Sequence, residues 1–313
     1  MKILIFGGNG FVGLNIAAAL LARGHAVTLF DRAGLPPAAK KDFTGYADQL
    51  TAIQGDVTDR QAIEGVIAAG HEAIVLGAAI TAGPERDATD PENIIRVNLL
   101  AQVPILIAAQ RRGVGRIINL SSAAAYGTST FRNVPLDEET ACDPVSLYAI
   151  TKFASEKVAA RLAALWQCEI VSVRLSAVFG PWERSNGVRD TLSPQAQILA
   201  AMQGGREAVL PRPGVRDWIF APDVAEAVAL LIEAERPKHQ LYNISTSVNG
   251  RRCNGARSWP LCIPASFAGL RKPVKRRRST CIVPLTVRRF RSRALRRSSA
   301  GARDSAAPIP LPI

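Results

Sequence analysis

The hydrophobic positions of the first 175 residues form short apolar runs that alternate with segments of helical period. Such runs are typical of strands buried on both faces of a parallel sheet. The strands predicted here are Lys2–Phe6, Ala26–Phe30, Leu50–Gln54, Ala73–Leu76, Arg116–Leu120 and Glu169–Arg174. Because strands and helices alternate, we expect an α/β fold with a doubly wound parallel sheet.

Capping and turn residues place the helices between these strands. A helical, Ala- and Leu-rich pattern covers Asn15–Arg23 and ends at a glycine. Asp59 is placed to cap a helix that runs through Ala69. A long helix is expected over Pro91–Gly113, with its proline in the first turn, and Pro104 is expected to kink it.

Fewer elements are predicted after residue 175. Residues Pro194–Gln203 and Asp223–Glu235 have helical patterns, and Gln240–Ile244 has the pattern of a strand. After residue 246 neither helical period nor strand alternation persists. We therefore divide the chain into a sheet domain (1–175), a small and incomplete C-terminal domain (176–246) and a tail (247–313).

The excess charge of the chain is concentrated in this tail. Of 39 Lys and Arg residues 16 follow Thr246, but only one of the 26 acidic residues does, so the tail carries +15 and the rest carries −2. Three interpretations are open: a shifted reading frame, a disordered segment without a role, or a basic arm for nucleic acid or an acidic membrane. The few aromatic residues argue against nucleic-acid binding.

Other features bear on compartment and metal. The apolar start runs directly into glycines, which is unlike a secretory signal, and no segment is expected to be apolar for long enough to span a membrane. The five cysteines form no CxxC pair and no metal spacing with the three histidines. We expect a cytoplasmic protein that binds no metal and does not enter a membrane.

A glycine-rich turn follows the first predicted strand. Gly7, Gly10 and Gly13 lie between that strand and the first helix, and Asp31 closes the second strand. This order of strand, glycine turn, helix and acid is typical of dinucleotide-binding proteins, in which backbone N–H groups approach the pyrophosphate. Asp31 would bind the adenosine ribose and repel a 2′-phosphate, which favours NAD over NADP, although the neighbouring Arg32 weakens that preference.

Tyr148 and Lys152 are the candidate catalytic pair. Four residues apart on a helix, their side chains share one face. An isolated phenol has a pKa near ~10, and a nearby ammonium lowers it by favouring the phenolate. The pair therefore suits proton exchange with a substrate hydroxyl or carbonyl. Ser122 follows the fifth strand, at the sheet edge where ligands bind in open parallel sheets.

Taken together, these motifs resemble the extended short-chain dehydrogenase/reductases, in the NAD-dependent epimerase/dehydratase branch. The resemblance runs from residue 1 to about residue 246 and implies a Rossmann fold, with NAD bound by residues 1–175 and substrate by 176–246. The motifs that carry it, in order, are the glycine turn, Gly55–Asp56–Val57, Val97–Asn98, Leu120–Ser121–Ser122 with Tyr126–Gly127, Tyr148-x-x-x-Lys152 and Gly214–Val215–Arg216–Asp217.

The resemblance also implies roles for single residues. Ser122 and Tyr148 would hold the substrate oxygen, Tyr148 would act as the base, and Lys152 would contact the nicotinamide ribose. Arg216 would contact a substrate phosphate, and Asn98 would fix the active-site helix. The residues expected at the cofactor are Gly7, Gly10, Phe11, Val12, Asp31, Arg32, Asp56, Val57, Ala78, Ala79, Asn98, Tyr148 and Lys152.

Departures from the family pattern bear on which reaction and which substrate are expected. Sugar dehydratases of the family follow the catalytic hydroxyl with an Asp–Glu pair, but this chain has Ala123 and Ala124, so dehydration is not expected. Ala177 replaces the Asn that usually meets the diphosphate of a nucleotide sugar, so a smaller sugar or sugar acid is also credible. Residues 181–193 would form either a substrate loop or a solvated loop.

We therefore expect an NAD-dependent epimerase or dehydrogenase that acts on a sugar or nucleotide-sugar hydroxyl. The resemblance further implies a homodimer formed through the helices near Pro91–Arg112 and Val145–Leu165. The alternatives are a non-catalytic module of the same fold that senses NAD(P), which would commonly lack the Tyr and Lys, and a nucleic-acid binder that acts through the tail.

Overall fold

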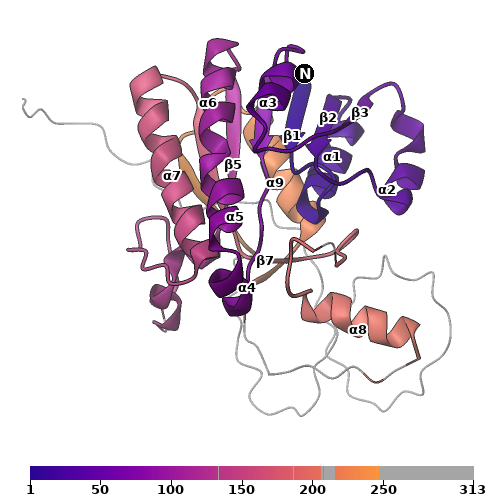
Figure 1. Cartoon of the computed structure of the whole chain (residues 1–313), viewed down its shortest axis with the longest axis vertical. Helices are drawn as coiled ribbons and strands as arrows, with labels where there is room; N and C mark the ends of the chain where they lie inside the picture. Colours follow the sequence, from indigo (N-terminus) through magenta and orange to yellow (C-terminus); the bar gives the residue numbers. More distant parts are fainter. Residues whose placement is uncertain (133, 186, 206, 208–215, 247–313) are drawn as a thin grey trace, which may run out of the picture. The chain divides into compact units, whose positions relative to one another are not determined.

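The computed structural model describes the chain except for residues 133, 186, 206, 208–215 and 247–313 (Figure 1). The predictions for the tail, and those for Gly214 and Val215, therefore lie outside the described residues. The fold below is that of the residues up to Thr246.

A sheet of seven parallel strands forms the centre of this part of the chain. Its order is β3-β2-β1-β4-β5-β6-β9, and every neighbouring pair is parallel. The strands are β1 (Lys2–Phe6), β2 (Ala26–Asp31), β3 (Leu50–Gln54), β4 (Ala73–Leu76), β5 (Arg116–Ser122), β6 (Ile170–Leu175) and β9 (Leu241–Ile244). The strand order reverses between β1 and β4, which is where a doubly wound sheet binds its ligand.

Helices cover both faces of this sheet, so alternate residues of a strand enter two different cores. On one face, Ile3 and Ile5 of β1 pack with α1 (Phe11–Ala22) and α9 (Ala221–Glu233). On the other face, Leu4 and Phe6 pack with residues of three further helices. These are α3 (Arg60–Ile67), α6 (Gln102–Arg111) and α7 (Leu147–Trp166). The apolar strands predicted from the sequence are thus buried on both sides.

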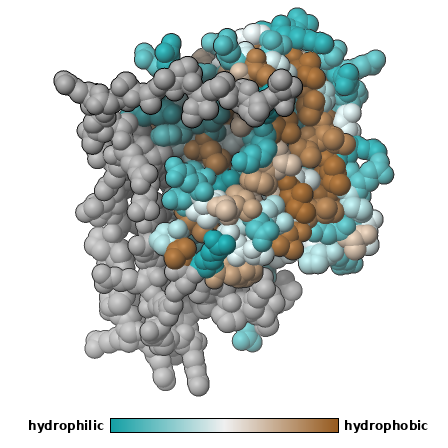
Figure 2. Space-filling model, turned by 90° about the vertical axis from the view of Figure 1, so that its left-hand side faces the viewer, coloured by the Kyte–Doolittle hydropathy of each residue, from teal (hydrophilic) through white to brown (hydrophobic). Residues whose placement is uncertain are grey.

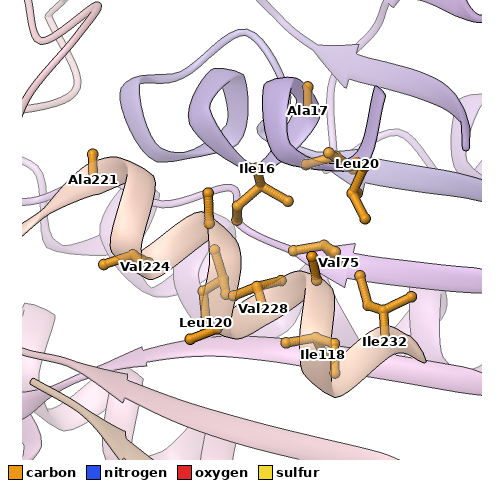
Figure 3. Close-up of a cluster of buried hydrophobic side chains, with 14 of the residues drawn as sticks. Ile16, Ala17, Leu20, Val75, Ile118, Leu120, Ala221, Val224, Val228 and Ile232 are labelled. Atoms are coloured by element: carbon orange, nitrogen blue, oxygen red, sulfur yellow. The ribbon is translucent and has the colours of Figure 1, made fainter. Parts of the chain in front are cut away.

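The contact between α1 and α9 shows how distant segments build the first core. Figure 3 shows Ile16 and Leu20 of α1 gathered with Val228 and Ile232 of α9 and with Val75 of β4. All five side chains are at most 2% exposed. Helix α9 and strand β9 therefore belong to the cover and the edge of the parallel sheet, although both follow residue 175. The domain boundary that we predicted at this residue stays a prediction.

Most elements lie where the sequence placed them. The six strands predicted up to residue 174 are present, with shifts of at most two residues at their ends, and Asp59 caps α3 by accepting N–H bonds from its first turn. The sequence missed the short helices α2 (Pro37–Asp42) and α4 (Pro84–Thr89). It also missed β7 (Ala177–Phe179), which pairs with β8 (Trp218–Phe220) in a separate sheet.

The long helix predicted over Pro91–Gly113 is interrupted, and earlier than expected. It consists of α5 (Pro91–Ile95), a π-helical turn from Arg96 to Leu100, and α6. Proline lacks an N–H group, and its ring crowds the carbonyl four residues earlier. Pro104 therefore disturbs the helix at Leu100, where the π turn ends, rather than at its own position.

The expectation that no segment is apolar for long enough to span a membrane was wrong for Pro91–Arg111. Its 21 residues are long and apolar enough to cross a bilayer by length and composition, and 44% of its most apolar stretch is buried. Ile94, Ile105 and Leu106 are almost completely buried in this fold. The core helix of a globular domain passes the same test of length and composition.

Candidate active site

Two neighbouring elements bring the predicted catalytic side chains to the carboxyl edge of the sheet. Ser122 is the last residue of β5, and its hydroxyl accepts the Ala124 N–H at 3.1 Å. Helix α7 is capped by the Ser146 hydroxyl, which accepts the Ala149 N–H at 3.2 Å. Tyr148 lies in the first turn of α7 and Lys152 one turn later, as their spacing predicted.

The Tyr148 phenol is a half-buried group held by two hydroxyls. It hydrogen-bonds with the side chains of Ser122 and Thr81. Burial raises the pKa of Tyr148, while these two hydrogen bonds and the charge of Arg189 act to lower it. Thr81, in the loop after β4, was not among the predicted site residues, because nothing in its local sequence distinguishes it from an ordinary loop threonine.

Lys152 lies behind the phenol and is almost completely buried. Its Nζ donates to the Leu120 carbonyl oxygen at 2.7 Å and lies 6.0 Å from the centre of the Tyr148 ring. Burial lowers the pKa of Lys152 to about 8, against the opposing effect of the Glu156 carboxylate. The structure thus brings Ser122, Tyr148 and Lys152 together, whereas the ribose contact of Lys152 stays a prediction.

Asn98 ties the loop after β4 to the active-site helix. Its Oδ1 accepts the Ile80 N–H at 2.7 Å, and its Nδ2 donates to the Ile80 carbonyl oxygen at 2.9 Å and to the Thr151 hydroxyl at 3.3 Å. The side chain is completely buried in the π-helical turn. These bonds hold the residues that adjoin Thr81 and lie on α7, close to Tyr148.

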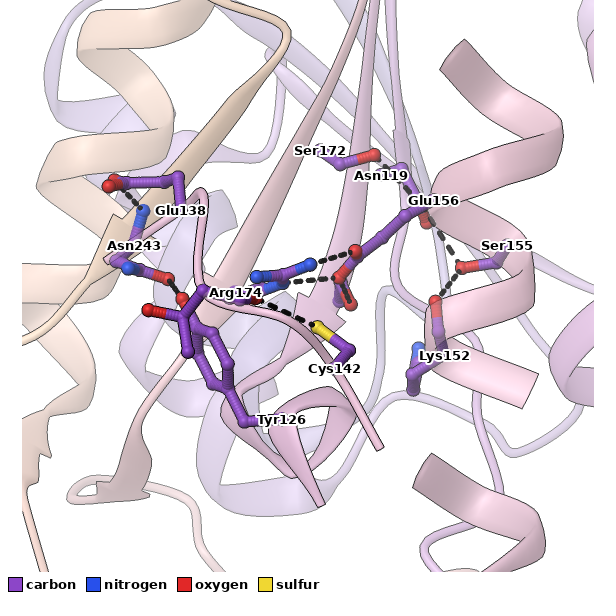
Figure 4. A network of polar contacts seen from close by, with 12 residues as sticks. Asn119, Tyr126, Glu138, Cys142, Lys152, Ser155, Glu156, Ser172, Arg174 and Asn243 are labelled. Atoms are coloured by element: carbon purple, nitrogen blue, oxygen red, sulfur yellow. Dashed lines mark hydrogen bonds and ion pairs between the residues drawn. The ribbon is translucent and has the colours of Figure 1, made fainter. Parts of the chain in front are cut away.

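A buried ion pair near Lys152 was missed by the sequence reasoning. Figure 4 shows the Glu156 carboxylate, from α7, accepting two bonds from Arg174 of β6. Glu156 also accepts a bond from the Ser121 hydroxyl, and the Arg174 guanidinium lies 4.5 Å from the centre of the Tyr126 ring. Both charged side chains are at most 5% exposed. The signal in the sequence was an acid four residues after Lys152, on the same face of the helix.

The network extends from this ion pair to the edge of the sheet. The Tyr126 hydroxyl lies 2.8 Å from both Asn243 Oδ1 and the Asp137 carbonyl oxygen, and its single proton is available to either acceptor. The Asn243 N–H donates to Glu138 at 2.8 Å. The network therefore connects the strand that ends in Ser122 with α7, β6 and β9, and it fixes the elements on which the candidate site is built.

The glycine turn after β1 fits the pyrophosphate of a dinucleotide. A Cβ on Gly7, whose φ is +76°, would lie 2.6 Å from the Ala78 backbone nitrogen, and one on Gly13 would lie 2.4 Å from the Gly7 carbonyl oxygen. Glycine alone allows this close packing of turn, helix and strand end. The N–H groups of Phe11 and Val12 lie in the first turn of α1, where a helix offers them no internal acceptor.

Asp31 lies at the end of β2, beside this turn. Its carboxylate accepts the Asn9 N–H at 3.1 Å and the Ala33 N–H at 2.9 Å. Burial raises the pKa of Asp31, while these bonds and the charges of Arg184 and Arg32 lower it. Arg32 is exposed, whereas Arg184 donates to the Asn9 carbonyl oxygen at 2.7 Å. The cation held at the turn is therefore Arg184, which the sequence reasoning did not relate to the cofactor.

Four more residues predicted at the cofactor lie at the neighbouring strand ends. Val57 and Ala78 line the same small cavity, and Val57 is 8% exposed. Asp56 accepts bonds from the Thr58 N–H and hydroxyl, both at 2.8 Å. Ala79 follows Ala78 and is half-buried. The individual contacts of these residues to a cofactor stay predictions.

The remaining predicted residues are less closely connected to the site. Arg216 is exposed before β8, next to residues outside the described part, so its phosphate contact stays a prediction. Ala123 and Ala124 form the turn after Ser122, where they provide no acid or base. Among the described residues, no cluster of three His, Cys, Asp or Glu side chains could hold a metal ion.

Comparisons with known proteins identify the family of the chain. The model of the NAD dependent epimerase/dehydratase family matches residues 3–245. The UDP-glucose 4-epimerase of Corynebacterium glutamicum is 30% identical over 264 residues, which cover 79% of this chain and 75% of that protein. The dTDP-glucose 4,6-dehydratase of Mycolicibacterium smegmatis is 29% identical over 232 residues, which cover 73% of this chain and 67% of that protein.

Solved structures show the same arrangement. The UDP-N-acetylglucosamine 4-epimerase of Methanobrevibacter ruminantium, in complex with UDP-N-acetylmuramic acid, is 25% identical with a TM-score of 0.69, over 78% of this chain and 76% of that one. The UDP-glucose 4-epimerase of Thermus thermophilus, in complex with NAD, is 25% identical with a TM-score of 0.64, over 79% of this chain and 78% of that one. The parallel sheet, the glycine turn and these matches identify NAD as the cofactor. The chain is therefore an enzyme that belongs to the NAD dependent epimerase/dehydratase family.

Proposed function

We propose that this enzyme epimerises a hydroxyl-bearing carbon of a nucleotide sugar, with Tyr148 as the proton acceptor. The observation that supports this most is the hydrogen bond between Tyr148 and Ser122 at the sheet edge, with Lys152 one helical turn behind. Relatives named as UDP-sugar 4-epimerases support the substrate class. Because Ala177 replaces the expected Asn, a smaller sugar or sugar acid is the second candidate.

The side chains divide the proton chemistry between them. Thr81 and Ser122 orient the phenol, and Ser122 also provides a hydroxyl for the substrate oxygen. The phenolate form of Tyr148 removes the proton from the substrate hydroxyl and returns it at the end of the reaction. Bound NAD supplies the hydride acceptor and donor for the carbon atom.

Epimerisation and simple oxidation use the same residues, but dehydration needs more. Elimination of water requires an acid and a base beside the sugar carbons, and the turn after Ser122 offers only Ala123 and Ala124. We therefore favour epimerase or dehydrogenase activity over that of the dehydratase relatives. A sensing module without catalysis has less support, because Tyr148 and Lys152 are both present and lie together.

The proposal is tested by incubating the full chain with NAD and a panel of nucleotide sugars and sugar acids. Product stereochemistry is read by NMR, and NADH absorbance is followed in parallel. An epimerase gives an inverted centre without net NADH, whereas a dehydrogenase gives NADH. Binding of NAD without any conversion across the panel would favour the sensing module.

The oligomer that fits this enzyme is a homodimer formed through α5, α6 and α7. Leu100, Ile150 and Leu165 are large apolar residues in this region, exposed by 56%, 42% and 57%. Figure 2 shows apolar side chains gathered on the side of the molecule where α6 and α7 lie.

In the described part of the chain Cys142 and Cys168 are free thiols, which fits the predicted cytoplasmic location.

A further inference from the structure

Residues 187–193, which we name the strap, lie against the loop that holds the phenol of Tyr148. The Thr81 N–H donates to the Val188 carbonyl oxygen at 2.7 Å, and the Asp190 N–H donates to the Thr81 carbonyl oxygen at 3.3 Å. These two bonds flank Arg189, which itself pairs with Thr81 in a parallel bridge. Since the Thr81 side chain bonds to Tyr148, the strap and the phenol share one anchor.

The strap is fixed to this loop by further contacts on both sides of Arg189. Asp190 accepts the Gly83 N–H at 2.7 Å, and Arg86 donates to the Gly187 carbonyl oxygen at 2.7 Å. An ion pair between Arg86 and Asp190 at 3.4 Å adds to these contacts. The backbone of Arg189 is therefore held next to Thr81 by bonds that do not involve the Arg189 side chain.

The side chain of Arg189 contacts Phe11, at the start of α1, and is held by Glu183. Its guanidinium is 5.5 Å from the centre of the Phe11 ring and pairs with the Glu183 carboxylate at 3.2 Å. Glu183 is 2% exposed and also accepts bonds from the Ser193 N–H and hydroxyl, at 2.7 and 2.6 Å. A carboxylate that is itself held by Ser193 therefore holds the guanidinium in place.

We propose that Arg189 is a positioning residue of the reaction, whose permanent charge stabilises the phenolate of Tyr148 that must be present to accept the substrate proton. This inference rests on the proposed function, since it assigns a role beside the proposed base. Arg189 and Tyr148 belong to separate segments of the chain, and Thr81 connects them, because it pairs with Arg189 and bonds to Tyr148.

Lys152 supplies a charge that depends on pH. Its Nζ is bonded to the Leu120 carbonyl oxygen, and burial lowers the pKa of Lys152 to about 8. Such an ammonium loses its charge as the pH rises toward the range in which a phenol ionises, whereas a guanidinium stays protonated throughout. Arg189 is the cation that acts to lower the pKa of Tyr148 among the described residues.

Two carboxylates lie in the neighbouring segments, and Asp87 has one oxygen, Oδ1, that is buried without a hydrogen-bond partner in the part of the chain that the structure describes. Asp87 of α4 accepts the N–H of Leu147, at the start of α7, at 3.0 Å, and Asp190 is paired with Arg86. The neutral groups on the phenol come from β5 and from the loop after β4. The groups that face it are, by element, Lys152 on α7, Ser122 on β5, Thr81 after β4, and Arg189 on the strap with Glu183 beside it.

The test is a titration of the Tyr148 phenol in the full chain, without substrate. Phenolate absorbance is recorded against pH for each variant, and the spectrum of the matching variant with Tyr148→Phe is subtracted to remove the other three tyrosines. Arg189→Met should raise the pKa of Tyr148 by about one unit or more, because a nearby opposite charge is lost. Arg189→Lys retains the positive charge, so the pKa of Tyr148 should stay close to that of the parent protein.

A second variant should shift the pKa of Tyr148 in the opposite direction. Glu183→Gln removes the carboxylate that offsets the guanidinium, so it should lower the pKa of Tyr148 while Arg189→Met raises it. Loss of structure would move both variants in the same direction. Shifts in the same direction, or no shift with either variant, would overturn the proposal, and Glu183→Gln keeps it testable if Arg189→Met does not fold.

Measurements of kcat test whether the pKa shift of Tyr148 affects the reaction. With an active substrate, Arg189→Met should lower kcat near neutral pH by about tenfold for each unit by which the phenol pKa rises, and the acidic limb of the pH–kcat profile should move up by the same amount. A rise in KM with kcat unchanged would instead show that Arg189 binds a substrate anion, contrary to the proposal. Full turnover by Tyr148→Phe would refute the proposed function and leave the titration result standing.

Discussion

The phenol of Tyr148 is the single group on which the proposed chemistry depends most directly. Tyr148→Phe removes the proton acceptor and little contact area, so kcat should fall by about 10²–10⁴-fold while the Kd for NAD stays nearly unchanged. Ser122→Ala should lower kcat by roughly 10²-fold, because the phenol and the substrate oxygen lose one partner. Tyr46→Phe, a change away from the site, is the control. A Tyr148→Phe enzyme that works at the parent rate would show that another group is the base.

At the same scale, Asp31 is predicted to favour NAD over NADP. Its carboxylate occupies the end of β2 and would meet a 2′-phosphate with like charge, so NAD should bind at least about tenfold more tightly than NADP. Arg184 reduces this difference but does not remove it, because it is bonded to the Asn9 carbonyl oxygen. Asp31→Asn should narrow the gap between the two dissociation constants, as measured by titration calorimetry. Equal binding of both cofactors by the parent enzyme would contradict this role.

At the scale of elements, the ion pair between Glu156 and Arg174 joins α7 to β6. Arg174→Met leaves the Glu156 carboxylate buried without its partner, which should lower the free energy of unfolding by about 3–5 kcal/mol. The matched control is Arg96→Met, which breaks the exposed pair with Glu92 and should cost less than about 1 kcal/mol. Urea unfolding of the two variants compares these values. Similar costs for both changes would mean that burial of the pair contributes little.

At the scale of the whole molecule, the exposed apolar face of α5, α6 and α7 predicts self-association. Leu100→Glu places a charge on this face, so the protein should change from dimer to monomer at micromolar concentration, as measured by light scattering. Leu230→Glu, at a residue of α9 that is 50% exposed, is the control and should leave the mass unchanged. A parent protein that is monomeric at this concentration would contradict the homodimer.

Whole-molecule architecture and much of the site were predictable from local patterns. Six strands, the glycine turn and the spacing of Tyr148 and Lys152 depend on periodicity, on turn chemistry and on helix geometry, all of which act over a few residues. The interruption near Leu100 was placed too late, because proline disturbs the carbonyl four residues before it rather than its own position.

By itself, the sequence determined the doubly wound sheet, the dinucleotide turn and the pairing of Tyr148 with Lys152, because each is recorded in patterns that extend over a few residues. Only the tertiary structure decided which distant groups surround the phenol. Thr81 and Arg189 reach it through pairing of the strap with another loop, and Glu156 meets Arg174 through packing of α7 on the sheet. Such contacts depend on where whole elements come to rest, and no local pattern records them.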